Sequence, residues 1–325
     1  KLTDTYSRVH DYLRISLTDS CNFRCVYCMP DENMQCLPHK ELMQADEVFR
    51  IAETFVEYNI SKIRLTGGEP LVRHDFAEIV EKLSQLPVEL TLTTNGVLLH
   101  KHLDLFKRTG IKSVNISIDS LNENTFKSLT KRNVLAQVWE NILLYVKEGF
   151  HVKLNVVVMK GINEQEITDF ISLTRNLPVH VRFIEFMPFS GNQWEKDRVV
   201  TTPEMLVSIE EHFSIEKLQD EKHDTSKKYQ VLGAKGTFAF ITTMSHPFCG
   251  DCNRMRVTAD GKMKNCLFGK EEFDILGTLR EGEDINPVIQ KCLMRKKEKM
   301  GGQFENFQKL NPDNLKNRSM IKIGG

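Results

Sequence analysis

The sequence predicts an α/β fold: an incomplete, TIM-like (β/α)6 barrel followed by a smaller C-terminal α+β domain. Two observations lead to this prediction. Short runs of apolar and β-branched residues alternate with longer stretches of helical periodicity, and this alternation stops after about residue 188. Because strands joined through helices form parallel sheets, and the pattern contains six such units, we expect an open barrel rather than a closed eightfold one.

Each unit of the repeat can be located on the sequence. The predicted strands occupy residues 13–17, 62–66, 89–93, 113–118, 152–159 and 180–185. The predicted helices carry apolar residues at positions i, i+3 and i+4, and they occupy residues 45–58, 76–86, 98–109, 138–148 and 165–175. The repeat therefore accounts for most of the first two-thirds of the chain.

The last third of the sequence has a different pattern. A helix is predicted at 203–212, and a charged, lysine-rich stretch follows at 216–228. Short strands near 239–241 and 256–258 and a helix near 285–299 are typical of a small α+β unit. We therefore predict two domains, residues 1–213 and 214–325. Taken alone, the polar segment 311–325 is expected to be a frayed tail.

The composition argues against several classes of protein. The 325 residues include 44 Lys plus Arg and 44 Asp plus Glu, so no overall charge favours a nucleic-acid polymer or a membrane surface. Apolar runs such as 152–159 are far shorter than the roughly 20 residues of a membrane helix, and no signal segment opens the chain. We expect a cytoplasmic enzyme in which local arginines bind any anionic ligand.

Six of the eight cysteines form two triplets with the spacing of metal ligands. Cys21, Cys25 and Cys28 read C-x3-C-x2-C directly after the first strand, where α/β enzymes place their chemistry. Three thiolates can hold three corners of a cubane iron–sulfur cluster and leave one iron open. A zinc site completed by Cys36 is the alternative. Cys36 and Cys292 are otherwise interpreted as ordinary thiols.

The second triplet has the spacing C-x2-C-x13-C and consists of Cys249, Cys252 and Cys266. A zinc site completed by His246 remains an alternative here. Arg254 and Arg256 alternate on an extended segment, so both guanidiniums would lie beside the metal and could bind phosphate, although two solvated charges would fit the same pattern. The sequence has no GxxxxGK[ST] loop, which predicts that a bound nucleotide is a substrate and not an energy source.

After the second strand the sequence reads TGGEP at residues 66–70. With the first triplet, this segment resembles the radical S-adenosylmethionine (SAM) superfamily, whose GGEP motif receives the amino group of the methionine moiety. Glycines let the main chain approach a ligand closely, and Glu69 can accept hydrogen bonds from an ammonium. With the second triplet and CNRMR, nearly the whole chain resembles the branch of this superfamily that cyclises GTP early in molybdenum-cofactor (molybdopterin) biosynthesis.

The resemblance implies a 4Fe-4S cluster at each triplet. The first cluster would bind SAM with the help of four residues, Tyr27, Gly68, Ser117 and Met187. Its reduction would cleave SAM and release a 5'-deoxyadenosyl radical, with the protein positioning that radical. The open iron of the second cluster would meet the guanine of GTP. The implied enzyme is a lyase that converts GTP to (8S)-3',8-cyclo-7,8-dihydroguanosine 5'-triphosphate.

The resemblance also implies which residues act on GTP. Side chains from several strand ends would bind it: Arg14, Arg64, Thr93, Lys153, Arg254, Met255 and Arg256. Catalysis would depend on Arg14, Arg254 and Arg256 and on the terminal Gly324-Gly325 pair, which the family is thought to thread into the active site. The expected functional partners are an electron donor and the downstream cyclic pyranopterin monophosphate synthase. A homodimer is one possible assembly.

From the residues alone, other interpretations stay open. Arg14 and Lys153 alternate with apolar neighbours and could form ion pairs inside the barrel, while Thr93, Ser117 and Met187 could be packing residues. A radical SAM enzyme that modifies a peptide could carry the same two triplets. An electron carrier or a zinc-stabilised binding module would need neither TGGEP nor the paired arginines.

Overall fold

The computed structural model describes residues 1–28, 35–221 and 223–324. Within them, a single sheet of 12 strands runs in the order β14-β13-β12-β3-β4-β5-β6-β7-β8-β11-β10-β9. Every neighbouring pair between β12 and β11 in this order is parallel, and the pairs outside them are antiparallel. The predicted α/β fold with a mostly parallel sheet is therefore confirmed. The outermost strands, β14 and β9, do not pair with each other, so the described sheet is open and forms no closed barrel.

The six central strands are the six that the sequence predicts, within a residue or two at each end. They are β3 (Tyr12–Ser16), β4 (Lys62–Thr66), β5 (Glu89–Thr94), β6 (Ser113–Ser117), β7 (His151–Val158) and β8 (His180–Glu185). In β3 the fully buried Leu13 and Ile15 face the core, so the intervening Arg14 is directed to the other side of the sheet. This alternation sets apart the residues of the site from those of the core.

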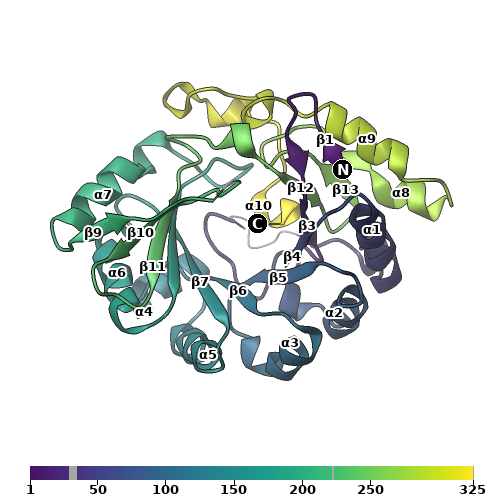
Figure 1. Cartoon of the computed structure of the whole chain (residues 1–325). Helices are drawn as coiled ribbons and strands as arrows, with labels where there is room; N and C mark the ends of the chain where they lie inside the picture. The colour runs from purple at the N-terminus through teal and green to yellow at the C-terminus, as the bar shows by residue number, and fades with distance from the viewer. Residues whose placement is uncertain (29–34, 222, 325) are drawn as a thin grey trace.

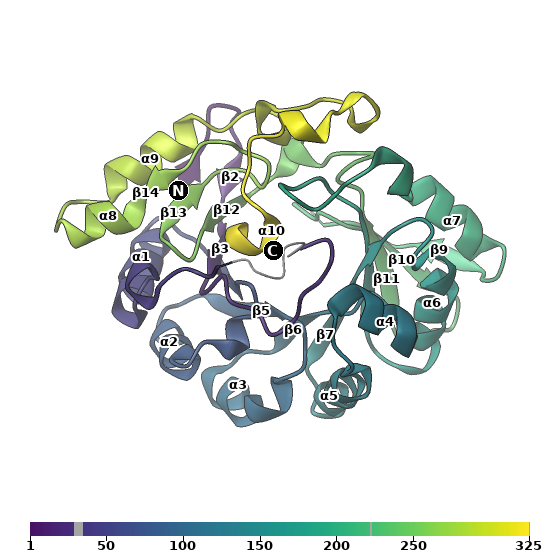
Figure 2. The ribbon, with the colours of Figure 1, turned by 180° about the vertical axis from the view of Figure 1, so that it is seen from behind.

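Helices cover the outer face of the arc that the strands form, as both views show (Figures 1 and 2). They are α1 (Ala45–Glu57), α2 (Phe76–Leu83), α3 (Leu103–Thr109), α4 (Glu123–Thr130), α5 (Leu135–Lys147) and α6 (Ile167–Asn176). In α1, for example, Val48, Ile51 and Phe55 follow the helical period and are fully buried. Helix α4 was not predicted, although Asn122 caps its N-terminus by accepting from Asn124 N and Thr125 N.

The C-terminal third extends the same sheet at both ends. After α7 (Thr202–Glu210) come β9 (Ile215–Lys217), β10 (Lys227–Val231) and β11 (Thr237–Ile241), and β11 pairs with β8. β12 (Arg254–Val257) pairs with β3 and is followed by β13 (Lys262–Lys264) and β14 (Phe273–Asp274). Helices α8 (Ile275–Arg280) and α9 (Asn286–Met294) follow, so the helix predicted near 285–299 is shorter than expected. The division at residue 213 stays a prediction.

Both ends of the described chain are anchored. At the start, β1 (Leu2–Thr3) and β2 (Val9–His10) form a small separate sheet. At the end, α10 (Met320–Ile323) lies on the concave side of the arc (Figure 1), and Ile321 and Ile323 are buried. The expectation of a frayed tail is therefore wrong for residues 311–324, because these apolar side chains give the segment a reason to dock. Gly325 lies outside the described residues.

In the described part of the chain, no helix has the length and apolar character needed to cross a membrane.

Candidate active site

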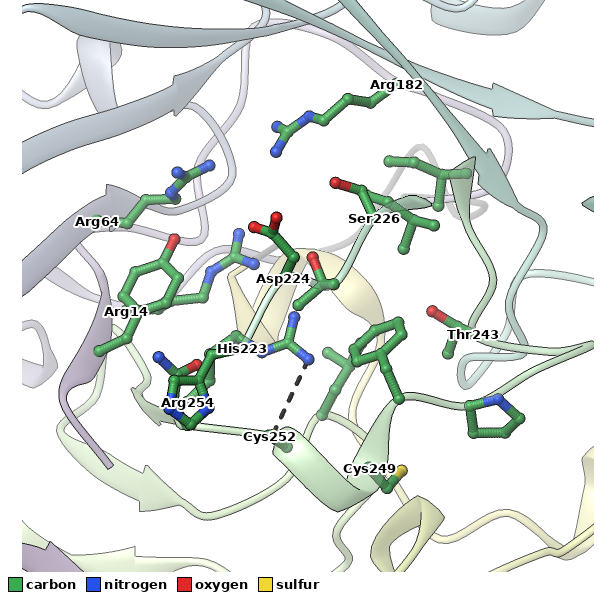
Figure 3. A pocket seen from close by; sticks show the side chains of 18 of the residues that line it. Arg14, Arg64, Arg182, His223, Asp224, Ser226, Thr243, Cys249, Cys252 and Arg254 are labelled. Atoms are coloured by element: carbon green, nitrogen blue, oxygen red, sulfur yellow. Dashed lines mark hydrogen bonds between the residues drawn. The ribbon is translucent and has the colours of Figure 1, made fainter. Parts of the chain in front are cut away.

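A cavity of about 570 Å³ lies against the concave face of the sheet. Its lining combines residues from both ends of the sequence because β12 is hydrogen-bonded beside β3. The register of these strands places Arg256 opposite Arg14, and Arg14 opposite Arg64. Three arginines therefore form a row across three adjacent strands, which we call the arginine row. Figure 3 shows Arg14 and Arg64 directed towards the same space as Arg182 of β8.

The site carries far more positive than negative charge. Burial, followed by the repulsion of neighbouring cations, lowers the pKa of Lys153 to about 8, of Arg182 to about 9 and of Arg256 to about 10. The same two causes lower the pKa of Arg14. Among the described residues, the buried Nε atoms of Arg14 and Arg64 have no hydrogen-bond partner. Buried cations and unsatisfied donors are costly unless paired, so the cavity is suited to a multiply charged anion.

The first cysteine triplet lies in the loop that follows β3. Main-chain hydrogen bonds tie this loop to the end of α4, from Arg24 N to Thr130 O (3.0 Å) and from Val26 N to Leu129 O (3.0 Å). Burial raises the pKa of the Cys21 thiol to about 11 and that of Cys28 to about 12, and the neighbouring cysteine and carboxylate charges contribute. Ionised together, these thiols would repel one another, so the donor set fits a cationic metal centre.

The TGGEP segment packs directly on the start of this loop. A Cβ atom at Gly67 would lie 2.7 Å from Thr18 O, and one at Gly68 would lie 2.3 Å from Ser20 O, so no side chain fits at either position. The Glu69 carboxylate accepts hydrogen bonds from Thr94 Oγ1 (2.7 Å) and from the main-chain N–H groups of Asn95 (2.6 Å) and Leu71 (3.1 Å). In this structure Glu69 therefore holds the strand-end loops together, and burial raises its pKa to about 7.

The other residues predicted to bind SAM lie at the same edge of the sheet. Tyr27 donates its hydroxyl to Asp119 (2.5 Å), whose other oxygen accepts from Val157 N (2.8 Å). Ser117 ends β6, and Met187, which follows β8, lines the cavity. Thr93, which was predicted to bind the substrate, lies one residue before the end of β5, and its buried Oγ1 has no partner within the described residues. The structure thus brings these positions together at the carboxyl ends of parallel strands, where α/β enzymes bind ligands.

The second triplet is assembled by an antiparallel hairpin. Arg256 of β12 pairs with Lys264 of β13, so Cys252, just before β12, and Cys266, just after β13, lie at the same end of the hairpin. Cys249 begins the adjoining 3-10 turn, and its Sγ accepts from Met300 N (3.5 Å). Burial disfavours the Cys252 thiolate, but Arg254 and Lys296 outweigh that effect and lower its pKa to about 6.

The two residues that would complete the zinc alternatives are both exposed. Cys36 lies outside the first triplet, with its Sγ 3.9 Å from Asp19 O. His246 has its Nδ1 3.3 Å from Ser245 Oγ. Across residues 1–28, 35–221 and 223–324, no three His, Cys, Asp or Glu side chains are arranged to hold one metal ion.

The three residues of the NRMR segment that were predicted to bind substrate point in two directions. Arg254 lines the cavity, and its guanidinium lies 4.8 Å from the centre of the Phe248 ring and 3.9 Å from Cys252 Sγ (Figure 3). Arg256 also lines the cavity. Met255 lies between them, faces the opposite side of β12 and is fully buried in the core. Its side chain therefore does not line the cavity, because neighbouring residues of a strand face opposite sides. Substrate binding at Met255 stays a prediction, for its main chain.

The C-terminal tail reaches the arginine row. Arg256 donates to the carbonyl of Gly324 (3.1 Å), and this contact is buried. Gly324 has φ +84, and a Cβ atom there would lie 2.6 Å from Ser16 Cβ and 2.7 Å from Thr66 Oγ1. Glycine is therefore required at this position by both its backbone conformation and its close approach to β3 and β4. The predicted partner Gly325 lies outside the described residues.

Two family models match the chain: "Radical SAM superfamily" over residues 15–174 and "Molybdenum Cofactor Synthesis C" over residues 179–301. "GTP 3',8-cyclase, mitochondrial" of Arabidopsis thaliana is 43% identical over 100% of this chain and 83% of its own length. "GTP 3',8-cyclase" of Desulforamulus reducens is 41% identical over 91% of this chain and 94% of its own. This chain belongs to the GTP 3',8-cyclase family of radical SAM proteins.

Other relatives in the family are longer than this chain. "Molybdenum cofactor biosynthesis protein 1" of Mus musculus is 44% identical over 99% of this chain but only 51% of its own length. The chain thus spans about half the length of the first curated relatives it matches. A crystal structure of Streptococcus suis SuiB bound to S-adenosylmethionine has a TM-score of 0.63 at 12% identity, covering 96% of this chain and 73% of that one. This likeness concerns the fold.

The sequence analysis did not identify several polar residues that line the cavity. Arg182 donates to Asn155 Oδ1 through Nε (2.9 Å) and Nη2 (2.6 Å), and the Asn115 amide lies between Arg64 and Arg182. His180 lines the cavity on the same strand as Arg182. The sequence did contain a signal for these residues. Residues 180, 182 and 184 alternate with the apolar Val181 and Phe183, which are buried, so they face the cavity side of β8. The sequence analysis used this run only to predict a strand.

The pH dependence of stability should report the positive charge of this cavity. Burial, with Arg182 and Lys153 nearby, lowers the pKa of His180 to about 3 from 6.5, so this histidine stabilises the fold above pH 6.5 and loses that contribution as pH falls towards 3. Relative to His180→Gln, the wild-type apoprotein should lose about 2 kcal/mol between pH 6.5 and 5, measured by urea unfolding. Parallel pH profiles for the two proteins would contradict this.

Proposed function

We propose that this chain is a GTP 3',8-cyclase that converts GTP to (8S)-3',8-cyclo-7,8-dihydroguanosine 5'-triphosphate in molybdenum-cofactor biosynthesis. The observation that carries the proposal is the arginine row beside the second cysteine triplet in one cavity. A single ligand in this cavity would meet the arginine row, which can bind phosphate, on one side and a metal at the second cysteine triplet on the other. The family relationship narrows that ligand to GTP.

Two 4Fe-4S clusters are proposed, one for each triplet. Cys21, Cys25 and Cys28 would hold the first, with SAM bound against Tyr27, Gly68, Ser117 and Met187. When bound and reduced, this cluster and SAM supply the 5'-deoxyadenosyl radical. We infer that the β3 to β8 units act as an incomplete (β/α)6 barrel whose strand ends hold SAM on one side and GTP on the other.

The chain's own residues would position GTP and exclude water. Arg14, Arg64, Lys153, Arg254 and Arg256 would bind the triphosphate, and Thr93 would offer its free hydroxyl to the substrate. The second triplet, Cys249, Cys252 and Cys266, would hold the cluster that meets the guanine. The overall change transfers hydrogen from C3' of the ribose to the 5'-deoxyadenosyl radical, which becomes 5'-deoxyadenosine, and joins C3' to C8 of the base. One electron from a donor and one proton then reach N7 and complete the 7,8-dihydro product. The charge of the arginine row and the fixed cysteine hairpin would hold these two carbons near each other throughout.

The reaction also implies partners outside the chain. Reduction of the first cluster needs a one-electron donor, and the cyclic product is the substrate that a cyclic pyranopterin monophosphate synthase would take up. We also propose that two copies of the chain assemble as a homodimer.

The decisive experiment is anaerobic reconstitution followed by incubation with reductant, SAM and GTP. The proposal predicts about eight irons per chain, 5'-deoxyadenosine formation that depends on GTP, and a cyclised guanosine triphosphate detected by mass spectrometry. Eight irons with SAM cleavage but no nucleotide product would refute the cyclase and leave a radical SAM enzyme for another substrate, such as a peptide. Binding of zinc alone would refute both.

The arginines of β12 can be tested separately from radical formation. Arg254→Ala and Arg256→Ala should each weaken GTP binding about 10- to 100-fold, since a shielded, charge-assisted phosphate contact contributes about 1.5–3 kcal/mol. Calorimetric titration of GTP measures this, and reductive SAM cleavage should persist in both variants when GTP is saturating. Arg108→Ala, at an exposed position on α3, is the matched control. Wild-type GTP affinity in both β12 variants would refute their assignment.

The tail contact predicts a selective loss of turnover. Deletion of Gly324 and Gly325 removes the carbonyl that Arg256 binds, so product formation should fall at least tenfold while iron content stays near that of the full chain. The control is Gly233→Asn in the exposed β10–β11 turn. This substitution removes a glycine at a position with positive φ, which asparagine also tolerates, without shortening the turn. Full activity of the truncated protein would contradict a role for the tail.

A further inference from the structure

Lys296 is a buried lysine that contacts the second triplet. It lies two residues after α9 and is 4% exposed. Its Nζ donates to Asn265 O (2.6 Å) and Arg254 O (3.2 Å) and lies 3.6 Å from Cys252 Sγ. An ammonium has three donors, so these contacts use all of them. One side chain thereby joins the residue before Cys266, the start of β12 and a cysteine sulfur.

No carboxylate neutralises this ammonium within the described residues. The ion pairs found there include those of Lys264 with Glu272 and of Arg8 with Asp4, but none of Lys296. A buried ammonium is costly unless an anion lies close to it. Of its three contacts, two are neutral carbonyls, and Cys252 is the one that can carry negative charge. The position of Lys296 is therefore understandable if Cys252 is a thiolate in a negatively charged metal centre.

The neighbouring segment surrounds the same triplet with further hydrogen-bond donors. Met300 N donates to Cys249 Sγ (3.5 Å). Arg8, from the N-terminal sheet, donates to the carbonyls of Cys249 (2.8 Å), Glu298 (2.8 Å) and Lys297 (2.9 Å) while Asp4 pairs with its Nε. Arg8 therefore holds the main chain of these two segments in place, and Asp4 neutralises its charge. Lys296 (3.6 Å) and Arg254 (3.9 Å) both direct a positive charge at Cys252 Sγ, and Lys296 is the closer of the two.

We propose that Lys296 is a positioning residue of the second iron–sulfur site, which holds Cys252 and the β12–β13 hairpin in place and stabilises the reduced form of the cluster bound there. This rests on the proposed function in one respect, that the second triplet binds a 4Fe-4S cluster. Three thiolates give an oxidised cluster a net negative charge, and reduction adds one electron without breaking a bond or moving a proton. A fixed cation 3.6 Å from a ligand sulfur favours that added charge.

The experiment isolates the second site in the full-length chain. Cys21, Cys25 and Cys28 are replaced by Ala together, so that only the second triplet can bind iron. In this background, Lys296→Met keeps the length of the side chain and removes its charge, and Lys296→Arg keeps the charge. Lys297→Met, at the adjacent exposed residue, removes the same charge away from the site. Each protein is reconstituted anaerobically, its iron and sulfide are counted, and its midpoint potential is measured by titration with dithionite, which supplies the electron, and EPR.

Lys296→Met should either lose the irons of the second site while remaining folded by circular dichroism, or retain them at a more negative potential. The expected change is at least tenfold in the reduction equilibrium, about 59 mV for one electron. Lys297→Met should match the background protein, and Lys296→Arg should lie nearer to it than Lys296→Met does. If Lys296→Met does not fold, Lys296→Gln, which can still donate to the carbonyls, takes its place with the same expectations.

Two outcomes would overturn the inference, and they differ in what else they refute. Wild-type iron content and potential in the uncharged variant would show that Lys296 does not act on the cluster, and would leave the cyclase proposal intact. Absence of iron from the background protein with Lys296 in place would overturn the second cluster and the role of Lys296 together. Neither outcome depends on turnover of GTP.

Discussion

The repulsion among buried cations is the constraint on which this structure depends. The register of β12, β3 and β4 places Arg256, Arg14 and Arg64 side by side, with Arg64 and Arg256 buried and Arg14 half-buried. Like charges at this spacing oppose folding unless something neutralises them. The protein offsets only part of this positive charge, through the amide oxygens of Asn115 and Asn155 and through the carbonyl of Gly324, which accept hydrogen bonds from the arginines. The remaining charge is what makes the cavity a binding site for a polyanion.

The two cysteine triplets are held in different ways. The first lies in a loop that packs on TGGEP and on α4, where neutral hydrogen bonds and steric fit fix the main chain. The second lies at the end of a hairpin and is surrounded by Arg8, Arg254 and Lys296, with the charges of Arg254 and Lys296 directed at Cys252. Hydrogen bonding and charge around the sulfurs are what set the potential of an iron–sulfur cluster. The two cysteine triplets therefore offer different electrostatic environments to any metal centre bound there.

Much of this could be predicted from sequence because the signals are local. The six strands follow from short apolar runs, and the cysteine spacings follow from the needs of metal ligation. What could not be predicted depends on pairing between distant segments. Nothing in the local pattern shows that β12 lies beside β3, so the register of the arginine row and the placement of Lys296 could not be predicted from it. The family resemblance, and not the local pattern, gave the expectation that Arg14, Arg64 and Arg256 share a site with the C-terminal tail. It also named Met255, whose side chain the alternation along β12 directs to the core.

The pairing of β3 with β12 also bears on the order in which the protein is completed during synthesis. Residues 12–15 leave the ribosome before their neighbours at 254–257, which follow only after strands β4 to β11 have been made. Until then one edge of β3 lacks its partner, and the wall of the cavity formed by the hairpin is missing. Contacts between segments so far apart in sequence form late, since closing the intervening chain costs entropy first. The segment that carries Gly324 emerges later still, so the concave side of the sheet stays accessible to assembling cofactors until that segment docks against Arg256.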